Sequence, residues 1–275
     1  MKGIIKGYQQ ISLAELNSRA SLLHRTDNKY VLNSQQISAF LSSHQLQLDL
    51  LTIDGHERFQ YNNFYLDSDG YKTFFDHNKG RRKRFKIRFR HYTETDLYFF
   101  EVKVKGFRNE TLKYRILSDS TEYHAGHLPD RLRSFANETL NRAYGESLCD
   151  SFNYRSRVNY RRMTLVAKTS ETRITIDNNI QFINESCTAT LPNKYFIVEV
   201  KSRLGRSETD KWFWQNQLHP VRSCSKYGMA VSLLVFPDRN TRFRSVLKRY
   251  FPNPNGHELA RVSDEKRNKA LLVVQ

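Results

Sequence analysis

Charged and apolar side chains alternate strictly in several short segments of this chain, and this alternation constrains the fold most. In the segment from Arg84 to Arg90 the cations occupy even positions and the apolar side chains odd positions. Successive side chains of a β-strand point to opposite faces, so such a segment has one charged and one apolar face. The pattern recurs in the segments 101–105, 173–177 and 198–203. The sequence therefore predicts several strands that each bury one side and present charge on the other.

Helical patterns flank these strands. Capping-box spacing predicts a helix from Ser12, and apolar residues at helical spacing predict others from Ser34, over 129–144 and from Ser207. Strands are expected over 59–118 and 154–200. The apolar run 229–236 predicts one more strand, and 241–250 predicts a basic helix. Together these segments favour an α+β fold with a mostly antiparallel sheet.

The charge balance indicates an anionic partner. The 275 residues include 45 Lys+Arg against 28 Asp+Glu, a formal net charge of +17, and 39% are hydrophobic, enough for a packed core. We expect one domain over residues 1–251, followed by a polar C-terminal tail over 252–275.

Location is predicted from what the sequence does not show. No apolar run approaches the ~18 residues of a membrane span, and no secretory signal is visible at the N-terminus. The three cysteines have no metal-binding spacing, and free thiols are typical of a reducing compartment. We therefore expect a cytoplasmic protein without a transmembrane segment, and a membrane partner stays open.

The charged strand faces have two interpretations. For a single strand, a face exposed to water is the more common one. Cations dominate the charged faces of several strands here, and Glu101 and Glu199 each stand two residues from a lysine. A sheet that curled into a barrel with these faces inward would form a tunnel suited to phosphoryl groups, because Arg and Lys bind phosphate oxygens. Carboxylates nearby can hold a divalent metal ion that bridges phosphates.

The order of these motifs resembles the vacuolar transporter chaperone (VTC) domain. The resemblance covers roughly residues 20–235. Its segments are Arg25-x-Asp27-x-Lys29-Tyr30, Tyr65-x-Asp67, Lys86–Tyr92, Glu101-x-Lys103, Tyr160–Arg162, Arg173–Asp177, Val198–Lys201 and Ser225–Tyr227. This family is part of the triphosphate tunnel metalloenzymes, which are CYTH-like. The resemblance implies an antiparallel β-barrel tunnel with helices packed outside.

The resemblance also implies an activity and a set of residues. VTC enzymes are ATP-polyphosphate phosphotransferases, which transfer the γ-phosphate of ATP to a growing polyphosphate chain with Mn²⁺ or Mg²⁺. By resemblance, the catalytic phosphate-binding cations are Lys29, Arg88, Arg90, Lys103, Arg162, Arg173 and Lys226. Tyr160, Lys201, Arg84 and Lys86 are expected to bind substrate, and Glu199 is expected to bind the metal. The expected partners are ATP and polyphosphate or triphosphate, with no nucleic acid.

Two alternatives stay open at this point. A tunnel enzyme of the same fold could hydrolyse triphosphate or nucleoside triphosphates, and a non-enzymatic protein could simply bind polyanions. No P-loop is present, which argues against ordinary NTPase chemistry. The family usually has Glu where this chain has Asp27, so the role of Asp27 is in doubt.

Overall fold

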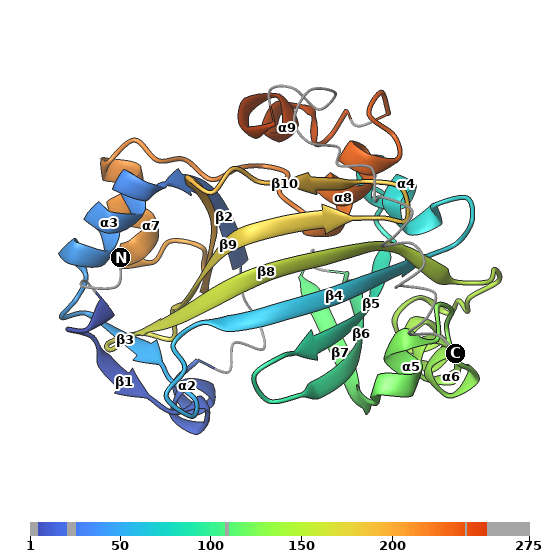
Figure 1. The fold of residues 1–275 in the computed structure, drawn as a ribbon, viewed down its shortest axis with the longest axis horizontal. Helices are drawn as coiled ribbons and strands as arrows, with labels where there is room; N and C mark the ends of the chain where they lie inside the picture. Colours follow the sequence, from blue (N-terminus) through green and yellow to red (C-terminus); the bar gives the residue numbers. More distant parts are fainter. Residues whose placement is uncertain (1–4, 21–25, 108–109, 240, 252–275) are drawn as a thin grey trace. The chain divides into compact units, whose positions relative to one another are not determined.

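The computed structural model describes residues 5–20, 26–107, 110–239 and 241–251. These residues form a mixed α+β structure whose strands, mostly antiparallel, belong to one hydrogen-bonded sheet (Figure 1). The strand order is linear, and the described strands do not pair into a closed ring. Enclosure of the charged faces in a tunnel therefore stays a prediction. The predicted tail over 252–275 and the predicted motif residue Arg25 lie outside the described residues.

The chain divides into two compact units, each built from separate stretches of sequence. Unit 1 contains residues 1–60, 160–179 and 192–222, and unit 2 contains residues 61–159, 180–191 and 223–275. Strands β8 (Asn153–Ala167) and β9 (Arg173–Ile183) each contribute residues to both units.

Unit 1 contains a sheet and three helices, two of which pack on the apolar face of the sheet. Its strands are β1 (Gln9–Ile11), β2 (Thr26–Asn33), β3 (Leu48–Leu51), the second part of β8, the first part of β9 and β11 (Tyr195–Ser202). Its helices are α2 (Leu13–Arg19), α3 (Ser34–Ser43) and α7 (Glu208–Gln215). The rings of Phe40 on α3 and Phe213 on α7 lie 4.9 Å apart in a core that also contains Tyr30, Val198 and Val200. This core leaves the opposite face of β2, β9 and β11 for charged side chains.

Unit 2 repeats this design with other elements. Its strands are the main part of β4 (Phe59–Asp67), β5 (Phe85–Tyr92), β6 (Leu97–Lys105), β7 (Thr111–Ser118), the first part of β8, the end of β9 and β10 (Thr188–Thr190). Its helices are α4 (Lys72–Asn78), α5 (Ser120–His124), α6 (Asp130–Tyr144), α8 (Lys226–Leu234) and α9 (Arg244–Tyr250). Ile87, Phe89, Phe100 and Val102 point from β5 and β6 into a core shared with Leu132 of α6.

Local signals explain where several helices begin and end. The side chain of Ser12 accepts a hydrogen bond from the backbone N–H of Glu15, and the Glu15 carboxylate accepts one from the backbone N–H of Ser12, as the capping box predicts. Helix α3 begins at Ser34 as expected, with Asn33 as its cap. Gly145 ends α6 in the left-handed conformation (φ 68°), which a residue without Cβ adopts at little cost.

One predicted strand is wrong. The segment expected to be a strand over 229–236 lies mostly within helix α8. Its side chains from Tyr227 to Leu233 are all buried, so the segment lacks the polar face that reveals a surface helix. The strands β1, β2 and β3 and the short helices α4 and α5 were not predicted. The basic helix expected over 241–250 is α9, which begins at Arg244.

Candidate functional site: two charged sheet faces

The charged face of unit 1 is set by the register of three strands. Glu199 of β11 pairs with Lys29 of β2 on one side and with Thr175 of β9 on the other. Two residues along, Lys201 pairs with Asp27 and Arg173. Directly opposed residues in antiparallel strands project from the same face, so these residues form two adjacent rows on one surface.

Glu199 binds both lysines of this surface. Its carboxylate oxygens lie 3.0 Å from Lys29 Nζ and 3.1 Å from Lys201 Nζ. The hydroxyl of Thr175, directly across from Glu199, is buried and has no hydrogen-bond partner among the described residues. A buried polar atom without a partner is costly. The Thr175 hydroxyl is therefore suited to contact a ligand that Glu199 also binds.

Arg162 and Tyr160 of β8 lie at a second charged cluster of unit 1. The Arg162 guanidinium donates two hydrogen bonds to the Asp177 carboxylate, at 2.6 and 2.8 Å, and lies 5.2 Å from the Tyr160 ring. Asp177 and Tyr160 are both only 1% exposed. Arg162 is therefore held in a defined orientation by a fork-type pair.

Arg173, which strand register places on the same face, contacts the end of a helix. Its Nη2 donates hydrogen bonds to the carbonyl oxygens of Ala20, at 2.5 Å, and Leu16, at 3.4 Å, at the C-terminal end of α2. A cation at this position satisfies carbonyl groups that lack helical partners. In this conformation the side chain stabilises the end of a helix, so its predicted contact with phosphate needs a different rotamer.

The charged face of unit 2 contains a row of three lysines. Lys86 of β5 pairs with Lys103 of β6, and Lys103 pairs with Lys113 of β7. Directly opposed side chains in such strands have Cβ atoms about 4.5–5.5 Å apart, and like charges at this distance destabilise the sheet. We call Lys86, Lys103 and Lys113 the lysine row. A bound anion with several negative charges would relieve their repulsion.

The adjacent row centres on Glu101, which is fully buried. Arg88 Nη2 lies 2.5 Å from Glu101 Oε2, while Arg90 Nη1 and Lys113 Nζ lie 3.8 and 3.5 Å from Oε1. Burial raises the pKa of the Glu101 carboxyl, but the charges of Arg88, Arg90 and Lys113 together hold that pKa well below its usual range. One carboxylate thus organises several cations and leaves the cluster with a net positive charge.

Arg88 and Arg90 are also oriented by polar groups of β4. Arg88 Nη1 donates to the Tyr65 hydroxyl at 3.0 Å, and Arg90 Nε donates to Asn63 Oδ1 at 3.0 Å. Both guanidinium groups belong to buried residues, with 7% and 6% exposure. Such preorganised groups bind anions with little loss of side-chain entropy.

Helix α8 places Lys226 beside the end of the lysine row. Lys86 Nζ lies 2.6 Å from Ser225 Oγ, and this same oxygen accepts a hydrogen bond from Gly228 N to cap α8, which begins at Lys226. Tyr227 donates to Asp67 Oδ2 at 2.5 Å. The segment that carries Lys226 is therefore tied to β5 on one side and to β4 on the other.

Arg84 continues the alternating row of β5 but lies just before the strand begins. Its guanidinium donates to the carbonyl oxygen of Arg81. Burial lowers the pKa of the Arg84 guanidinium, and the charge of Arg242 lowers it further. Arg84 is thus at the edge of the charged face, near other cations.

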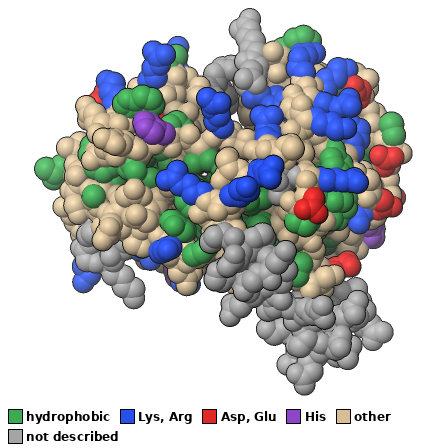
Figure 2. All heavy atoms as spheres, turned by 90° about the horizontal axis from the view of Figure 1, so that it is seen from above, with side chains coloured by type: hydrophobic (Ala, Val, Ile, Leu, Met, Phe, Trp, Pro, Cys, Tyr) green, Lys and Arg blue, Asp and Glu red, His purple; other side chains and the backbone are tan. Residues whose placement is uncertain are grey.

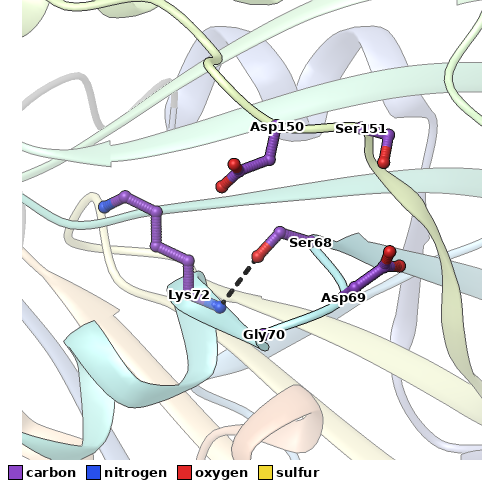
Figure 3. A pocket seen from close by; sticks show the side chains of 6 residues that line it. All are labelled: Ser68, Asp69, Gly70, Lys72, Asp150 and Ser151. Carbon is purple, nitrogen blue, oxygen red and sulfur yellow. Dashed lines mark hydrogen bonds between the residues drawn. The ribbon is translucent and has the colours of Figure 1, made fainter.

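A small hollow in unit 2 lies apart from the predicted residues. It has a volume of about 370 Å³ and is lined by Ser68, Asp69, Gly70, Lys72, Asp150 and Ser151 (Figure 3). Lys72 is already paired with Asp76 at 2.7 Å, and Asp69 is paired with Arg155. Asp150 adds a further carboxylate, so the lining contains more acidic than basic side chains, and this hollow is a weaker candidate for binding an anion than the two charged faces.

Among the carboxylates of these faces, Glu101, Asp177 and Glu199 differ in access to a metal ion. Glu101 is 0% exposed and Asp177 is 1% exposed, whereas the Glu199 side chain is 17% exposed. The part of the chain described by the structure contains no group of three or more His, Cys, Asp or Glu side chains poised to hold a metal. Mg²⁺-type ions need only one or two protein carboxylates when substrate phosphates and water supply the other oxygens. Glu199, with the neighbouring Thr175 hydroxyl, fits this arrangement.

Sequence reasoning missed several residues of these faces. Glu101 was noted only as a neighbour of Lys103, and Lys113, Asp177 and Thr175 were not proposed as site residues. The signal for Lys113 was present, because Lys113 and Arg115 alternate with apolar residues in β7. Its place in the lysine row follows from strand register, which alternation alone does not specify.

Solved structures resemble the chain at low sequence identity. A putative adenylate cyclase from Vibrio parahaemolyticus shares 12% identity with a TM-score of 0.41, over 75% of this chain and 98% of that one. A putative adenylyl cyclase from Hippeastrum, described as having a dominant triphosphatase activity, shares 12% identity with a TM-score of 0.39, over 75% and 94%. Likenesses at these scores carry no argument about function. No curated protein matches the chain.

The sequence itself matches the model of one family across most of its length. The match is to the VTC domain and spans residues 24–235. It includes β2, both charged faces and all of α8, so every residue predicted to bind phosphate or metal lies within the matched region. The chain belongs to the VTC domain family.

Proposed function

We propose that this chain is a metal-dependent polyphosphate polymerase that transfers the γ-phosphate of ATP to a growing polyphosphate chain. The lysine row is the observation that supports this most directly. Three lysines opposed across β5, β6 and β7, beside the Arg88–Glu101 cluster, form a surface with an excess of positive charge. A substrate with closely spaced negative charges is the natural counterpart of such a row.

The roles of the residues follow from their surroundings. Arg88 and Arg90 are held rigidly by Glu101 and by β4, so they are suited to bind and orient phosphoryl oxygens. Lys86, Lys103 and Lys226 add point charges that neutralise the charge developing on the transferred group. In unit 1, Lys29 and Lys201 would turn from Glu199 to phosphate oxygens when the carboxylate takes a metal ion.

A divalent metal, Mn²⁺ or Mg²⁺, would be held by Glu199 with the Thr175 hydroxyl beside it. When bound, such an ion supplies Lewis-acid polarisation of phosphoryl oxygens. A phosphate chain end is already a nucleophile, so the transfer requires no strong general base from the protein. Among the described residues no helix is long and apolar enough to cross a membrane. The cytoplasmic location stays a prediction.

The direct test incubates the purified protein with ATP and Mn²⁺, with and without a short polyphosphate primer, and resolves the products by gel electrophoresis. Long-chain polyphosphate is the expected product. Release of inorganic phosphate without polymer would instead identify a triphosphate or nucleotide hydrolase. Binding of polyphosphate without turnover would indicate a non-enzymatic polyanion-binding protein.

Glu199→Gln tests the metal assignment. We expect this variant to lose metal-dependent turnover and measurable Mn²⁺ binding by calorimetry, with little change in stability, because Glu199 is partly exposed. Glu208→Gln is a matched control, since the Glu208 side chain is 84% exposed on α7 and forms an ion pair with Lys211. Full activity in Glu199→Gln would show that another group holds the metal.

A further inference from the structure

Two segments far apart in the sequence form a basic surface on unit 2. The Asn78 side chain donates to the carbonyl oxygen of Arg239 at 3.0 Å and accepts from the backbone N–H of Arg242 at 3.2 Å. A Cβ atom at Gly80 would lie 2.9 Å from Arg242 Nη1, so the Arg242 guanidinium rests against the turn that leads to Arg84. We call Arg84, Arg242, Arg244, Lys248 and Arg249 the basic corner.

Among the residues that the structure describes, no carboxylate forms an ion pair with the cations of the basic corner. Neighbouring cations are balanced, since Arg81 lies 3.2 Å from Asp76 and Lys83 lies 2.7 Å from Glu146. For the five residues of the basic corner, no ion pair is recorded within the described part of the chain. Figure 2, which views the side where α9 lies in Figure 1, shows Lys and Arg side chains in several patches with few carboxylates.

The basic corner continues the charged face of unit 2. Arg84, Lys86, Arg88 and Arg90 alternate along β5 and its entry, a distance of about 20 Å at ~3.3 Å per residue. Helix α8, tied to Lys86 through Ser225, packs closely on the residue before α9, because a Cβ at Gly228 would collide with the Phe243 ring. Cations therefore extend from the buried Arg88 cluster toward the solvent-exposed α9.

We propose that the basic corner is a second contact site for a polyphosphate chain, holding the part that extends beyond the lysine row. This inference rests on the proposed function and adds to it a preference for long chains. A triphosphate would contact only the charged sheet face, whereas a longer chain would also reach Arg242 and α9. Long polyphosphate chains should therefore bind more tightly than triphosphate.

The surroundings of the basic corner favour a chain of phosphates over other polyanions. Phe243 and Tyr250 are buried, with 0% and 6% exposure, so α9 presents no rings on which nucleic-acid bases would stack. The apolar residues Val246 and Leu247 are buried in unit 2, so α9 has no apolar face left for insertion into a membrane. What remains at the surface is cationic.

The test compares affinities of two probes for three proteins. The variant Arg242→Ala/Arg244→Ala/Lys248→Ala removes three charges from the basic corner. The control Arg142→Ala/Lys194→Ala/Arg206→Ala removes three exposed charges elsewhere. Binding of inorganic triphosphate and of long-chain polyphosphate is measured by calorimetry at two salt concentrations without ATP.

For the corner variant we expect about tenfold weaker binding of long-chain polyphosphate and a shallower salt dependence, with triphosphate affinity within about twofold of wild type. The control should lose far less for the long chain. The proposal would be overturned if the corner and control variants lost equal affinity for long-chain polyphosphate. It would also be overturned if the corner variant lost as much affinity for triphosphate as for the long chain. So would a wild-type protein that binds the long chain no better than triphosphate.

Two further probes check the occupant and separate the two proposals. If duplex DNA or phosphatidylserine vesicles lose as much affinity in the corner variant as polyphosphate does, polyphosphate is not the specific occupant. Absence of polymer synthesis with the expected binding pattern would reject the proposed polymerase activity but keep the basic corner as a chain-binding site. Polymer synthesis without a chain-length effect on binding would support the polymerase activity but reject the basic corner as a chain-binding site.

Discussion

Replacing Glu101 by glutamine should destabilise the protein more than any comparable change in surface charge. Glu101 is 0% exposed and is the recorded ion-pair partner of Arg88, Arg90 and Lys113. Loss of one member of a buried ion pair costs about 3–5 kcal/mol, because the remaining charge stays buried without compensation. Glutamine keeps a carbonyl acceptor for Arg88, so we expect a loss near the lower limit, about 3 kcal/mol.

The assay is denaturant and thermal unfolding of the wild type and Glu101→Gln. At ~2–4 °C per kcal/mol for a chain of this size, the midpoint should fall by roughly 6–12 °C. Glu146→Gln is the control, since it breaks the Lys83–Glu146 pair in which both side chains are about half exposed. Its effect should stay within about 0.5 kcal/mol.

A second readout separates an electrostatic effect from a simple packing defect. The cations that Glu101 neutralises become available to an external anion, so Glu101→Gln should bind triphosphate more tightly than wild type. At 100 times its dissociation constant, triphosphate should restore about 2.7 kcal/mol of stability. A variant as stable as Glu146→Gln, or one that binds triphosphate more weakly than wild type, would refute this account of the cluster.

The pH dependence has a defined sign. Because the pKa of Glu101 is depressed in the folded state, its stabilising contribution is present above the usual carboxyl pKa of 4.5 and is lost as the pH falls through the folded-state value. Wild type should therefore lose this contribution between pH 4.5 and the lower folded-state pKa. Glu101→Gln should lack that part of the acid sensitivity.

Two other predictions concern unit 2. Burial lowers the pKa of Lys113 to about 8, so triphosphate affinity should fall as the pH rises from 7 to 9. This fall should be smaller in Lys113→Met. A variant whose affinity, measured by calorimetry, depends on pH as in the wild type would contradict the prediction. Lys113 also binds fewer protons folded than unfolded between pH 8 and its ordinary pKa of 10.5, so its penalty on folding should diminish across that range. Tyr227→Phe removes the donor to the buried Asp67 carboxylate and should cost about 1–3 kcal/mol in denaturant unfolding; a neutral result would show that the other donors satisfy Asp67 fully.

Alternation predicted the faces of the strands well because it depends only on local geometry. The apolar residues of β5 lie in the core with α6, and its cations lie on the opposite face, as the sequence indicates. Alternation does not say how deeply a cation is buried. Arg88 and Arg90 are among the most buried charged residues, because Glu101, Tyr65 and Asn63 satisfy them.

Features that depend on long-range pairing could not be predicted. The lysine row requires the register of β5, β6 and β7, and a shift of one residue would place each lysine on the other face. Arg173 shows a further limit, because strand register does not reveal that its long side chain also reaches the end of α2. Helix α8 was misjudged for a third reason: a segment buried on all sides has no amphipathic period.

The carboxylates of the charged faces bear on the choice between transfer to phosphate and hydrolysis. A hydrolase of this kind must activate water, which requires an available base or a metal-bound water. Glu101 is a poor base because surrounding cations hold its pKa well below the usual range, and Asp177 is occupied by both nitrogens of the Arg162 fork. Only Glu199 among these three is partly exposed, and we assign it to the metal. Glu101 and Asp177 are therefore poorly suited to remove a proton from water, and water activation by these faces would have to come from a metal held at Glu199, whereas a phosphate chain end needs no proton removed before attack.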